Sequence, residues 1–344
     1  MKKQFIIPVL ILIAGIFTSC SNDDQNFDDF DYSTVYFSYQ TPIRTIILGE
    51  DIYDTTLDNE YKCQIMATMG GVYENKNDVT IDISVDNSIV DNITFSDASD
   101  IKVMPDSYYS LNDDKIIIPK GNLWGGVEVQ LTDAFFADTA STHTTYVIPV
   151  RMLNVTNADS ILRGKSDYDD PNLFTSSDWT VEPKDYTLYA IKYINKYTGH
   201  YLRRGVDNIT GDTGNTDLDT SYIYHAEFVE KDEVVETSTK SLKIINLPIT
   251  VTNKIGEQNI YTLKIMFDDD DNCTITAPDE ASYSISGNGK YVVDGDSWGN
   301  EPKDALYLNY NIDNGSVTHA CTDTLVIRDR GVSFETFDAI LKEQ

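Results

Sequence analysis

Basic residues are scarce in this 344-residue chain, in which 26 Lys and Arg stand against 56 Asp and Glu and the formal net charge is −30. A nucleic acid is held mainly through its phosphates, and that contact needs a basic patch. The charge balance therefore predicts that no nucleic acid is a partner. The length suggests two domains, each large enough to bury a core of its own.

Long apolar runs are also lacking, because no segment after residue 20 has the ~20 apolar residues that a membrane-spanning helix requires. The apolar run over residues 5–17 is too short to span, and it follows two lysines, which is typical of a cleaved export signal. It ends in Phe17-Thr18-Ser19-Cys20, which resembles a bacterial lipobox. We expect residues 1–19 to be a lipoprotein signal peptide and Cys20 to carry the lipid; a plain signal peptide is the alternative.

Residues 20–34 follow the expected cleavage site and are acidic and rich in turn-forming residues. We expect them to form a flexible tether. The stretch resembles the acidic tag that directs lipoproteins of Bacteroidetes-type bacteria to the outer face of the outer membrane, and a solvated linker without an address is the alternative. One acylated cysteine attaches a protein to a membrane without a spanning helix. The predicted location is therefore the extracellular face of the outer membrane.

Cysteine is rare, with three residues besides Cys20, and this odd number argues against a full disulfide framework. Cys63 lies on the apolar side of an alternating run and is expected to be a buried small hydrophobe. Cys273 and Cys321 both fall in the second half of the chain. Sequence alone leaves open whether they pair.

Helical periodicity is nearly absent, and short alternating runs separated by turn residues recur instead. The run Thr80-Ile81-Asp82-Ile83-Ser84-Val85 places apolar and polar side chains on opposite faces of a strand. The pattern predicts an all-β chain. We expect an immunoglobulin-like β-sandwich over residues 35–164, a polar linker over 165–184 and an antiparallel meander closed into a β-barrel over 185–344. Only Ser333–Lys342, at the end of the chain, is expected to form a helical turn.

Several motifs resemble a known family. In the first half these are Ile116-Ile117-Ile118-Pro119-Lys120-Gly121 and Thr145-Tyr146-Val147-Ile148-Pro149-Val150; in the second half they are Gly199-His200-Tyr201-Leu202-Arg203-Arg204-Gly205 and Leu306-Tyr307-Leu308-Asn309-Tyr310. Together they resemble the two-domain surface lipoproteins of Bacteroidetes polysaccharide-utilisation loci. The resemblance implies a sandwich followed by a lipocalin-like barrel, and a role in surface glycan capture. It implies no set of ligand residues.

Catalytic motifs are weak. Gly295-Asp296-Ser297-Trp298-Gly299 matches the pattern of a nucleophile elbow, but that elbow needs a strand before the serine and a helix after it. The following residues predict another strand. Carboxylate pairs are so abundant that none marks a glycosidase site. The run Asp268–Asn272 is expected to be a hairpin tip rather than a calcium loop, and the four histidines lack zinc spacing. The sequence thus predicts a non-catalytic protein without metal or cofactor.

Aromatic residues remain as candidate ligand contacts, because a sugar ring presents an apolar face that can stack on Trp or Tyr. Trp124, Trp179 and Trp298 all lie in predicted loops, where binding residues concentrate. For each one, the alternative is that it only covers the end of its own domain. Trp298 is the first choice, together with its sequence neighbours Asp296, Asn300 and Tyr291.

These observations predict a non-catalytic, lipid-anchored surface protein that binds an oligo- or polysaccharide, with an outer-membrane glycan importer as a further partner. Two other functions stay open. The C-terminal barrel could carry a small apolar ligand in its lumen. The chain could instead be a surface adhesin or a structural partner in a complex. An exposed aromatic platform favours the first function and an open, dry lumen favours the second.

Overall fold

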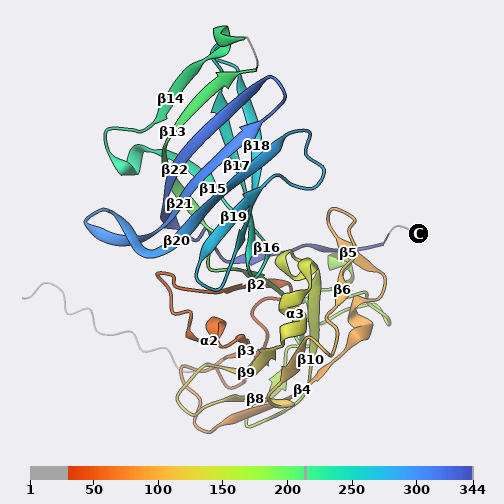
Figure 1. Cartoon of the computed structure of the whole chain (residues 1–344). Coiled ribbons are helices and arrows are strands. Elements are labelled where there is room, and N and C mark those ends of the chain that lie inside the picture. Colours follow the sequence, from red (N-terminus) through yellow and green to blue (C-terminus); the bar gives the residue numbers. More distant parts are fainter. Residues whose placement is uncertain (1–29, 213–214, 343–344) are drawn as a thin grey trace, which may run out of the picture.

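The computed structural model describes residues 30–212 and 215–342. Figure 1 shows two β-rich domains, with the first half of the chain below and a curled sheet above. The prediction of an all-β chain is confirmed. Within the described residues, no helix combines the length and apolarity needed to cross a membrane. The predicted signal peptide and Cys20 lie outside the described residues, as does most of the tether.

The N-terminal domain consists of two sheets that pack face to face. The first has the order β11-β1-β3-β9-β7 and the second β23-β2-β12-β10-β4-β8, with β6 beside β10. The strands of the first sheet are β1 (Thr34–Tyr36), β3 (Lys62–Gly70), β7 (Tyr109–Leu111), β9 (Trp124–Leu131) and β11 (Ser160–Ile161). Those of the second are β2 (Pro42–Ile47), β4 (Val79–Val85), β6 (Lys102–Val103), β8 (Lys115–Ile118), β10 (Tyr146–Thr156), β12 (Tyr186–Ile194) and β23 (Glu335–Thr336).

The alternation read from the sequence sets this packing. Val79, Ile81 and Ile83 on β4 are buried, and the residues between them are only half-buried. The inward residues of both sheets form one apolar core, which includes Phe37, Ile65 and Tyr193 among others. Burying each such side chain stabilises the fold by about 1.5–3 kcal/mol.

The C-terminal domain is one curled antiparallel sheet of ten strands. From β16 to β22 its strands follow one another in chain order, as the sequence predicts, and β13 then pairs with β22. The strands are β13 (His200–Gly211), β14 (Thr220–Tyr224), β15 (Glu233–Glu236), β16 (Ser238–Ser241), β17 (Ile244–Thr252), β18 (Gln258–Phe267), β19 (Asn272–Thr276), β20 (Ser284–Trp298), β21 (Glu301–Asp313) and β22 (Val317–Asp329).

Helices are few and short in the described part of the chain. The α-helices are α2 (Thr56–Asn59) and α3 (Asp133–Ala137), and the 3₁₀ turns are Asn87–Val90, Thr139–Thr142, Ser176–Asp178, Thr216–Leu218 and Val229–Lys231. α3 contributes Phe135 and Phe136 to the sandwich core, which is why so short a helix is retained.

The chain crosses between the domains in a way that differs from the predicted segmentation. β12 falls inside the segment assigned to the barrel, over 185–344, yet it pairs with β10 and β2 in the sandwich. Its apolar side chains Leu188, Ala190 and Ile191 are buried there. The predicted linker over 165–184 therefore leads back into the first domain, and the strands of the curled sheet begin at His200.

The end of the chain returns to the first domain. Helix was expected over Ser333–Lys342, but that segment instead forms β23 against β2 and β24 (Ala339–Leu341) against β5 (Ile93–Phe95). That expectation is wrong, because pairing with two open strand edges satisfies the backbone of this segment better than an isolated short helix could. Figure 1 shows this dark-blue segment crossing the junction of the two domains. We call residues 330–341 the C-terminal strap.

Arg330 fixes the start of the strap. Its side chain is 7% exposed, and it donates to the carbonyls of Leu48 at 3.1 Å, Glu50 at 2.9 Å, Asn195 at 2.7 Å and Thr198 at 2.7 Å. Two of these carbonyls follow β2 and two lie in the connection between β12 and β13. One guanidinium thus joins three segments at the domain junction.

Replacing Arg330→Met should destabilise the protein by at least ~3 kcal/mol, because it leaves several buried carbonyls without donors at ~1–3 kcal/mol each. Urea unfolding measures the change. Arg328→Met is the matched control, since the Arg328 side chain is half exposed, and it should cost less than about 0.5 kcal/mol. Equal stability of the two variants would contradict the role assigned to Arg330.

The three cysteines of the described chain are free and buried, so Cys273 and Cys321 do not pair. The expectation that Cys63 is buried is confirmed. Burial raises the pKa of the Cys63 and Cys273 thiols to about 12, and it raises the pKa of Cys321 as well.

Because a raised pKa keeps these thiols protonated, roughly one in 10⁴ is ionised at pH 8 in the folded state. We expect a thiol reagent such as Ellman's reagent to leave the folded chain from residue 21 onward unmodified at pH 8. It should label three thiols once guanidinium unfolds the chain. Rapid labelling of the folded chain would show that at least one of these sites is open.

Candidate functional site

The structure places the three candidate tryptophans in three separate regions. Trp298 is the last residue of β20 and is half-buried rather than in an open loop. Its Nε1 donates to the carbonyl of Ile327 at 2.9 Å, and the Lys303 ammonium lies 5.5 Å from the ring centroid. The indole is thus held against β22, the strand on the far side of its hairpin partner β21. This arrangement resembles the covering role that was the alternative for each tryptophan.

The sequence neighbours of Trp298 do not gather around it. Tyr291 is buried in the core of the curled sheet, where its hydroxyl donates to Asp304, and only 4% of it is exposed to a ligand. Inward alternation along β20 causes this burial. Asn300 is exposed in the two-residue turn after Trp298, where Gly299 and Asn300 both have positive φ, as a hairpin turn of this length requires. Asp296 is half-buried and accepts from the backbone N–H of Ser297.

Other motifs take the structures expected of them. Ser297 lies on a strand that continues through the hairpin turn into β21, so the strand–turn–helix of a nucleophile elbow is not formed there. Asp268–Asp271 connects β18 to β19 as a turn, in which Asp268 accepts from the backbone N–H groups of Asp270 and Asn272. Among the described residues, no group of three or more His, Cys, Asp or Glu side chains could hold a metal ion.

Trp179 belongs to the connection between β11 and β12 of the first domain. It is half-buried, and its Nε1 donates to the carbonyl of Asn172 at 2.8 Å. Its indole thus closes the local loop around the 3₁₀ turn Ser176–Asp178.

Trp124 is the exception, because it is 61% exposed and lines a cavity of about 480 Å³ on the N-terminal domain. This volume lies within the range of small-molecule sites. The cavity draws on β2, β3, β9, β12 and the strap. We call it the aromatic groove; its main side chains are Tyr39, Arg44, Gln64, Met66, Trp124, Tyr189 and Phe334.

Two glycines explain how Trp124 is presented. It is followed by Gly125 and Gly126 at the start of β9. A Cβ at Gly125 would lie 2.0 Å from the carbonyl oxygen of Ile117, and one at Gly126 would lie 2.4 Å from the sulfur of Met66. The glycines therefore let β8 and the Met66 side chain approach β9 closely, while the indole remains exposed.

Two further aromatic rings stand opposite each other in the groove. Tyr39 is 54% exposed and Phe334 is 64% exposed, and their ring centroids are 4.6 Å apart. Tyr39 follows β1, whereas Phe334 comes from the strap. This aromatic pair thus joins the two ends of the described chain. The position of Phe334 depends on how the strap is anchored.

Polar groups also line the groove. Arg44 donates to the buried carboxylate of Asp58, which also accepts from the backbone N–H of Ile47 at 2.9 Å. Burial raises the pKa of Asp58, while the Ile47 hydrogen bond and the Arg44 charge oppose this shift. The Arg44 side chain is one-third exposed, so it reaches the groove with its position set by Asp58. Tyr189 donates to the Gln64 carbonyl at 3.0 Å.

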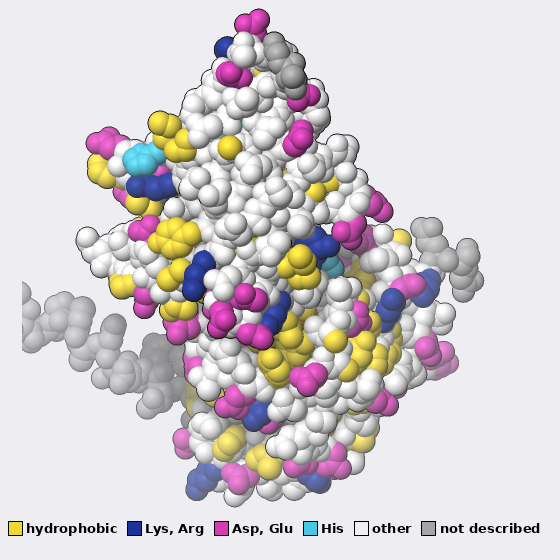
Figure 2. Space-filling view, in the orientation of Figure 1, with side chains coloured by type: hydrophobic (Ala, Val, Ile, Leu, Met, Phe, Trp, Pro, Cys, Tyr) yellow, Lys and Arg dark blue, Asp and Glu magenta, His cyan; other side chains and the backbone are white. Residues whose placement is uncertain are grey.

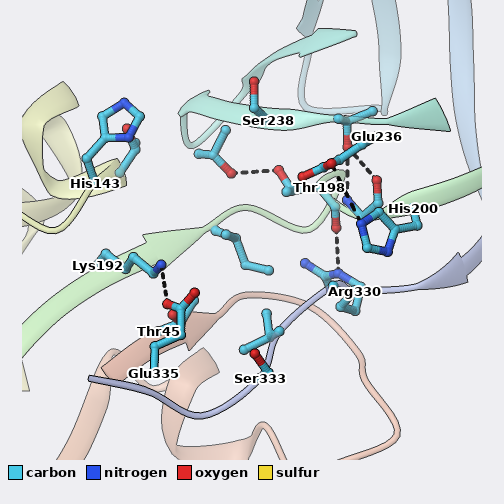
Figure 3. Close-up of a pocket in the computed structure, with 17 residues that line it drawn as sticks. Thr45, His143, Lys192, Thr198, His200, Glu236, Ser238, Arg330, Ser333 and Glu335 are labelled. Atoms are coloured by element: carbon cyan, nitrogen blue, oxygen red, sulfur yellow. Dashed lines mark hydrogen bonds and ion pairs between the residues drawn. The ribbon is translucent and has the colours of Figure 1, made fainter. Parts of the chain in front are cut away.

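A second pocket, of about 200 Å³, lies at the domain junction, and many of the residues that line it are polar or charged. Figure 3 shows Lys192 paired with Glu335, and Arg330 bonded to the backbone beside Thr198. His200 Nδ1 lies 2.5 Å from Asp329 Oδ1. These side chains are bonded to one another or to the backbone, and residues 330–333 and Glu335 of the strap line the pocket. We assign it to the joining of the domains.

The interior of the curled sheet is packed rather than open. A cluster of buried apolar side chains from β13 and β17–β22 fills it. Arg203 is fully buried there; its Nε donates to Asp323 at 3.0 Å and its Nη1 to the Thr250 carbonyl at 3.0 Å. Tyr310 donates to the same carboxylate at 2.6 Å.

Figure 2 shows acidic side chains spread over both domains and hydrophobic side chains gathered on the N-terminal domain just below the curled sheet. The acidic coat agrees with the net charge of −30. It keeps the surface soluble and repels polyanions.

Fold and groove together define a two-domain, all-β protein with an exposed aromatic site on its first domain. A model of a domain of unknown function (DUF5627) matches residues 196–331, and a model of an N-terminal domain matches residues 30–159. A crystal structure of a protein of unknown function from Bacteroides ovatus is 43% identical with a TM-score of 0.84; the match covers 91% of this chain and 100% of that one. The chain therefore belongs to the same family of two-domain proteins as this Bacteroides ovatus protein.

Two further crystal structures are much less similar. A two-domain protein of unknown function from Bacteroides fragilis NCTC 9343 is 12% identical, covers 90% of this chain and 92% of its own, and has a TM-score of 0.30. A proposed carbohydrate-binding protein from Bacteroides ovatus ATCC 8483 is 13% identical, covers 90% and 99%, and has a TM-score of 0.26. TM-scores this low support no conclusion about the fold or function of this chain. No curated protein matches the sequence significantly.

Sequence reasoning selected Trp124 but missed the residues that surround it. Tyr39, Arg44 and Phe334 come from distant parts of the chain and meet only through the sheet pairing of β2 and the strap. The sequence of β2 does not alternate, because the polar residues Arg44 and Thr45 are followed by the continuous apolar run Ile46-Ile47-Leu48. The strand was therefore not predicted. The sequence does contain a signal for this site, because Tyr39 and Trp124 both stand beside turn-forming residues.

Proposed function

We propose that this protein is a non-catalytic glycan-binding lipoprotein of the outer bacterial surface, and that the aromatic groove is its binding site. The protein captures an oligo- or polysaccharide and delivers it to an outer-membrane importer. The observation that carries the proposal is the exposure of Trp124, Tyr39 and Phe334 in one groove around the fixed guanidinium of Arg44.

This combination of groups suits a sugar. A pyranose ring has an apolar face that packs on exposed aromatic rings, and its hydroxyls need donors and acceptors around that face. The Arg44 guanidinium and the exposed Gln64 side chain can supply them. A soluble protein rarely leaves several large rings exposed in one concave surface unless the surface binds something.

The surface location rests on the N-terminal sequence. An apolar run that ends at Cys20 supports lipidation there, and the acidic residues that follow support export to the outer face. A tether over residues 20–34 would let the first domain stand at most about 50 Å from the lipid. The groove would then face material outside the cell.

Neither alternative function gains comparable support. The carrier hypothesis needs an open lumen, whereas the described side chains of the curled sheet form a packed core with Arg203 and Asp323 inside it. The adhesin hypothesis predicts no concave aromatic site. The non-catalytic assignment is supported by the turn that follows Ser297, where a nucleophile elbow would need a helix.

Glycan binding can be tested on the chain from residue 21 onward, which contains every described residue. Affinity electrophoresis in gels that contain single polysaccharides identifies a ligand, and calorimetry then gives its Kd. Trp124→Ala should weaken binding about 30-fold, because covering roughly 80 Å² of ring face contributes about 2 kcal/mol. Trp298→Ala should leave the Kd unchanged, since that indole is held against β22.

Trp124→Phe is the conservative control and should retain most of the affinity. Tyr168→Ala removes another exposed aromatic ring outside the groove and should have no effect. Loss of binding in Trp298→Ala with full binding in Trp124→Ala would move the site to the β20–β21 hairpin. Failure of every polysaccharide to retard the protein would contradict the proposed function.

A further inference from the structure

A third cavity, of about 400 Å³, lies next to the aromatic groove. It is bounded by the segment before α2, by Asp58 and by the strap. Ile43, Arg44 and Phe334 line both this cavity and the groove. The two cavities therefore lie on either side of the same three residues.

The shared residues form a crossing point that suits a chain-like ligand. Phe334 is 64% exposed, so its ring remains open to a ligand that passes from one cavity into the other. The position of Arg44 is fixed by its hydrogen bond to the buried Asp58 carboxylate. An aromatic ring and a fixed donor thus stand at the middle of a longer cleft, which we define as the aromatic groove plus the cavity beside it.

The far end of the cleft also carries an exposed aromatic ring. Tyr53 is 65% exposed and lines the second cavity. Hydrogen bonds fix the segment that presents it, because Asp54 accepts from the Thr56 backbone N–H at 2.9 Å and Thr55 donates to the Gly49 carbonyl at 2.8 Å. Trp124 and Tyr53 therefore mark the two ends of the cleft, and Phe334 lies at its crossing point.

The charges of the cleft specify the kind of chain that fits. The charged side chains that line it are Arg44, Asp54 and Asp58, and Arg44 is paired with Asp58. Among the described residues that line the cleft, no cation is left over for a ligand carboxylate or sulfate. The chain as a whole has a net charge of −30, which repels polyanions.

We infer that the cleft binds an internal segment of an uncharged polysaccharide, with sugar rings in both cavities at once. This inference rests on the proposed glycan-binding function and names its ligand class. A ligand of several rings occupies Trp124, Phe334 and Tyr53 together, whereas a mono- or disaccharide fills one cavity only. Affinity therefore rises with chain length until both cavities are filled.

The test uses the chain from residue 21 onward and two sets of polysaccharides in affinity gels. The neutral set contains amylopectin, levan, xyloglucan, galactomannan and yeast mannan; the anionic set contains polygalacturonate, alginate, heparin and chondroitin sulfate. Oligosaccharides of increasing length, prepared from a polymer that binds, are then titrated by calorimetry. We expect a neutral polymer to bind and Kd to fall at least about tenfold from the shortest ligand that binds to the longest.

Two variants separate the cavities. Tyr53→Ala should weaken binding of the long oligosaccharide about tenfold and leave binding of the shortest one unchanged if that ligand occupies the Trp124 end. Trp124→Ala should weaken both. Tyr53→Phe keeps the ring and should retain affinity, and Tyr168→Ala serves again as the exposed aromatic control. Unchanged urea midpoints would show that the variants are folded.

The outcomes distinguish this inference from the function it rests on. Binding that is lost in Trp124→Ala but insensitive to both Tyr53→Ala and chain length overturns the two-cavity cleft and keeps the glycan-binding function. Preference for the anionic set overturns the ligand class. Silence across both sets contradicts the proposed function, and the inference falls with it.

Discussion

Arg330 is the point on which the arrangement of this molecule depends. Its guanidinium donates to four carbonyls from two other segments at the domain junction, and it does so where the last strand of the curled sheet ends. From this point the strap must run along β2, because its next strand, β23, pairs there. The path of the strap then places Phe334 over the first domain.

The proposed binding site follows from that path. The first domain alone supplies Trp124, Tyr39 and Arg44, but the ring opposite Tyr39 comes from the strap. A contact at the domain junction therefore shapes a surface on one domain. None of the described residues of the curled sheet lines the groove. Its part in the site is to anchor the segment that carries Phe334.

The sequence predicts the elements whose patterns are local. Alternation over Thr80–Val85 gives β4, and the apolar side of the run around Cys63 gives β3. It fails where long-range pairing decides the structure. The strap pairs with two open edges that no local pattern announces, and β12 joins the sandwich although it follows a polar segment that looks like a boundary.

The candidate site divides in the same way. Trp124 was a candidate because it stands beside glycines in the sequence, and its ring is 61% exposed. Trp298 has similar neighbours, yet its indole bonds to Ile327 on a strand that the sequence does not place beside it. Tyr291 is buried because its position on β20 faces inward. The local sequence cannot tell which of these aromatic side chains is exposed, because the strands packed beside each one determine its exposure.

The account is tested most directly by a crystal structure of the protein grown with a neutral oligosaccharide long enough to fill both cavities. Electron density for sugar rings should lie on Trp124 and cross Phe334, with Arg44 bonded to ring hydroxyls. Ordered sugar at the β20–β21 hairpin or inside the curled sheet, with the aromatic groove empty, would contradict the account.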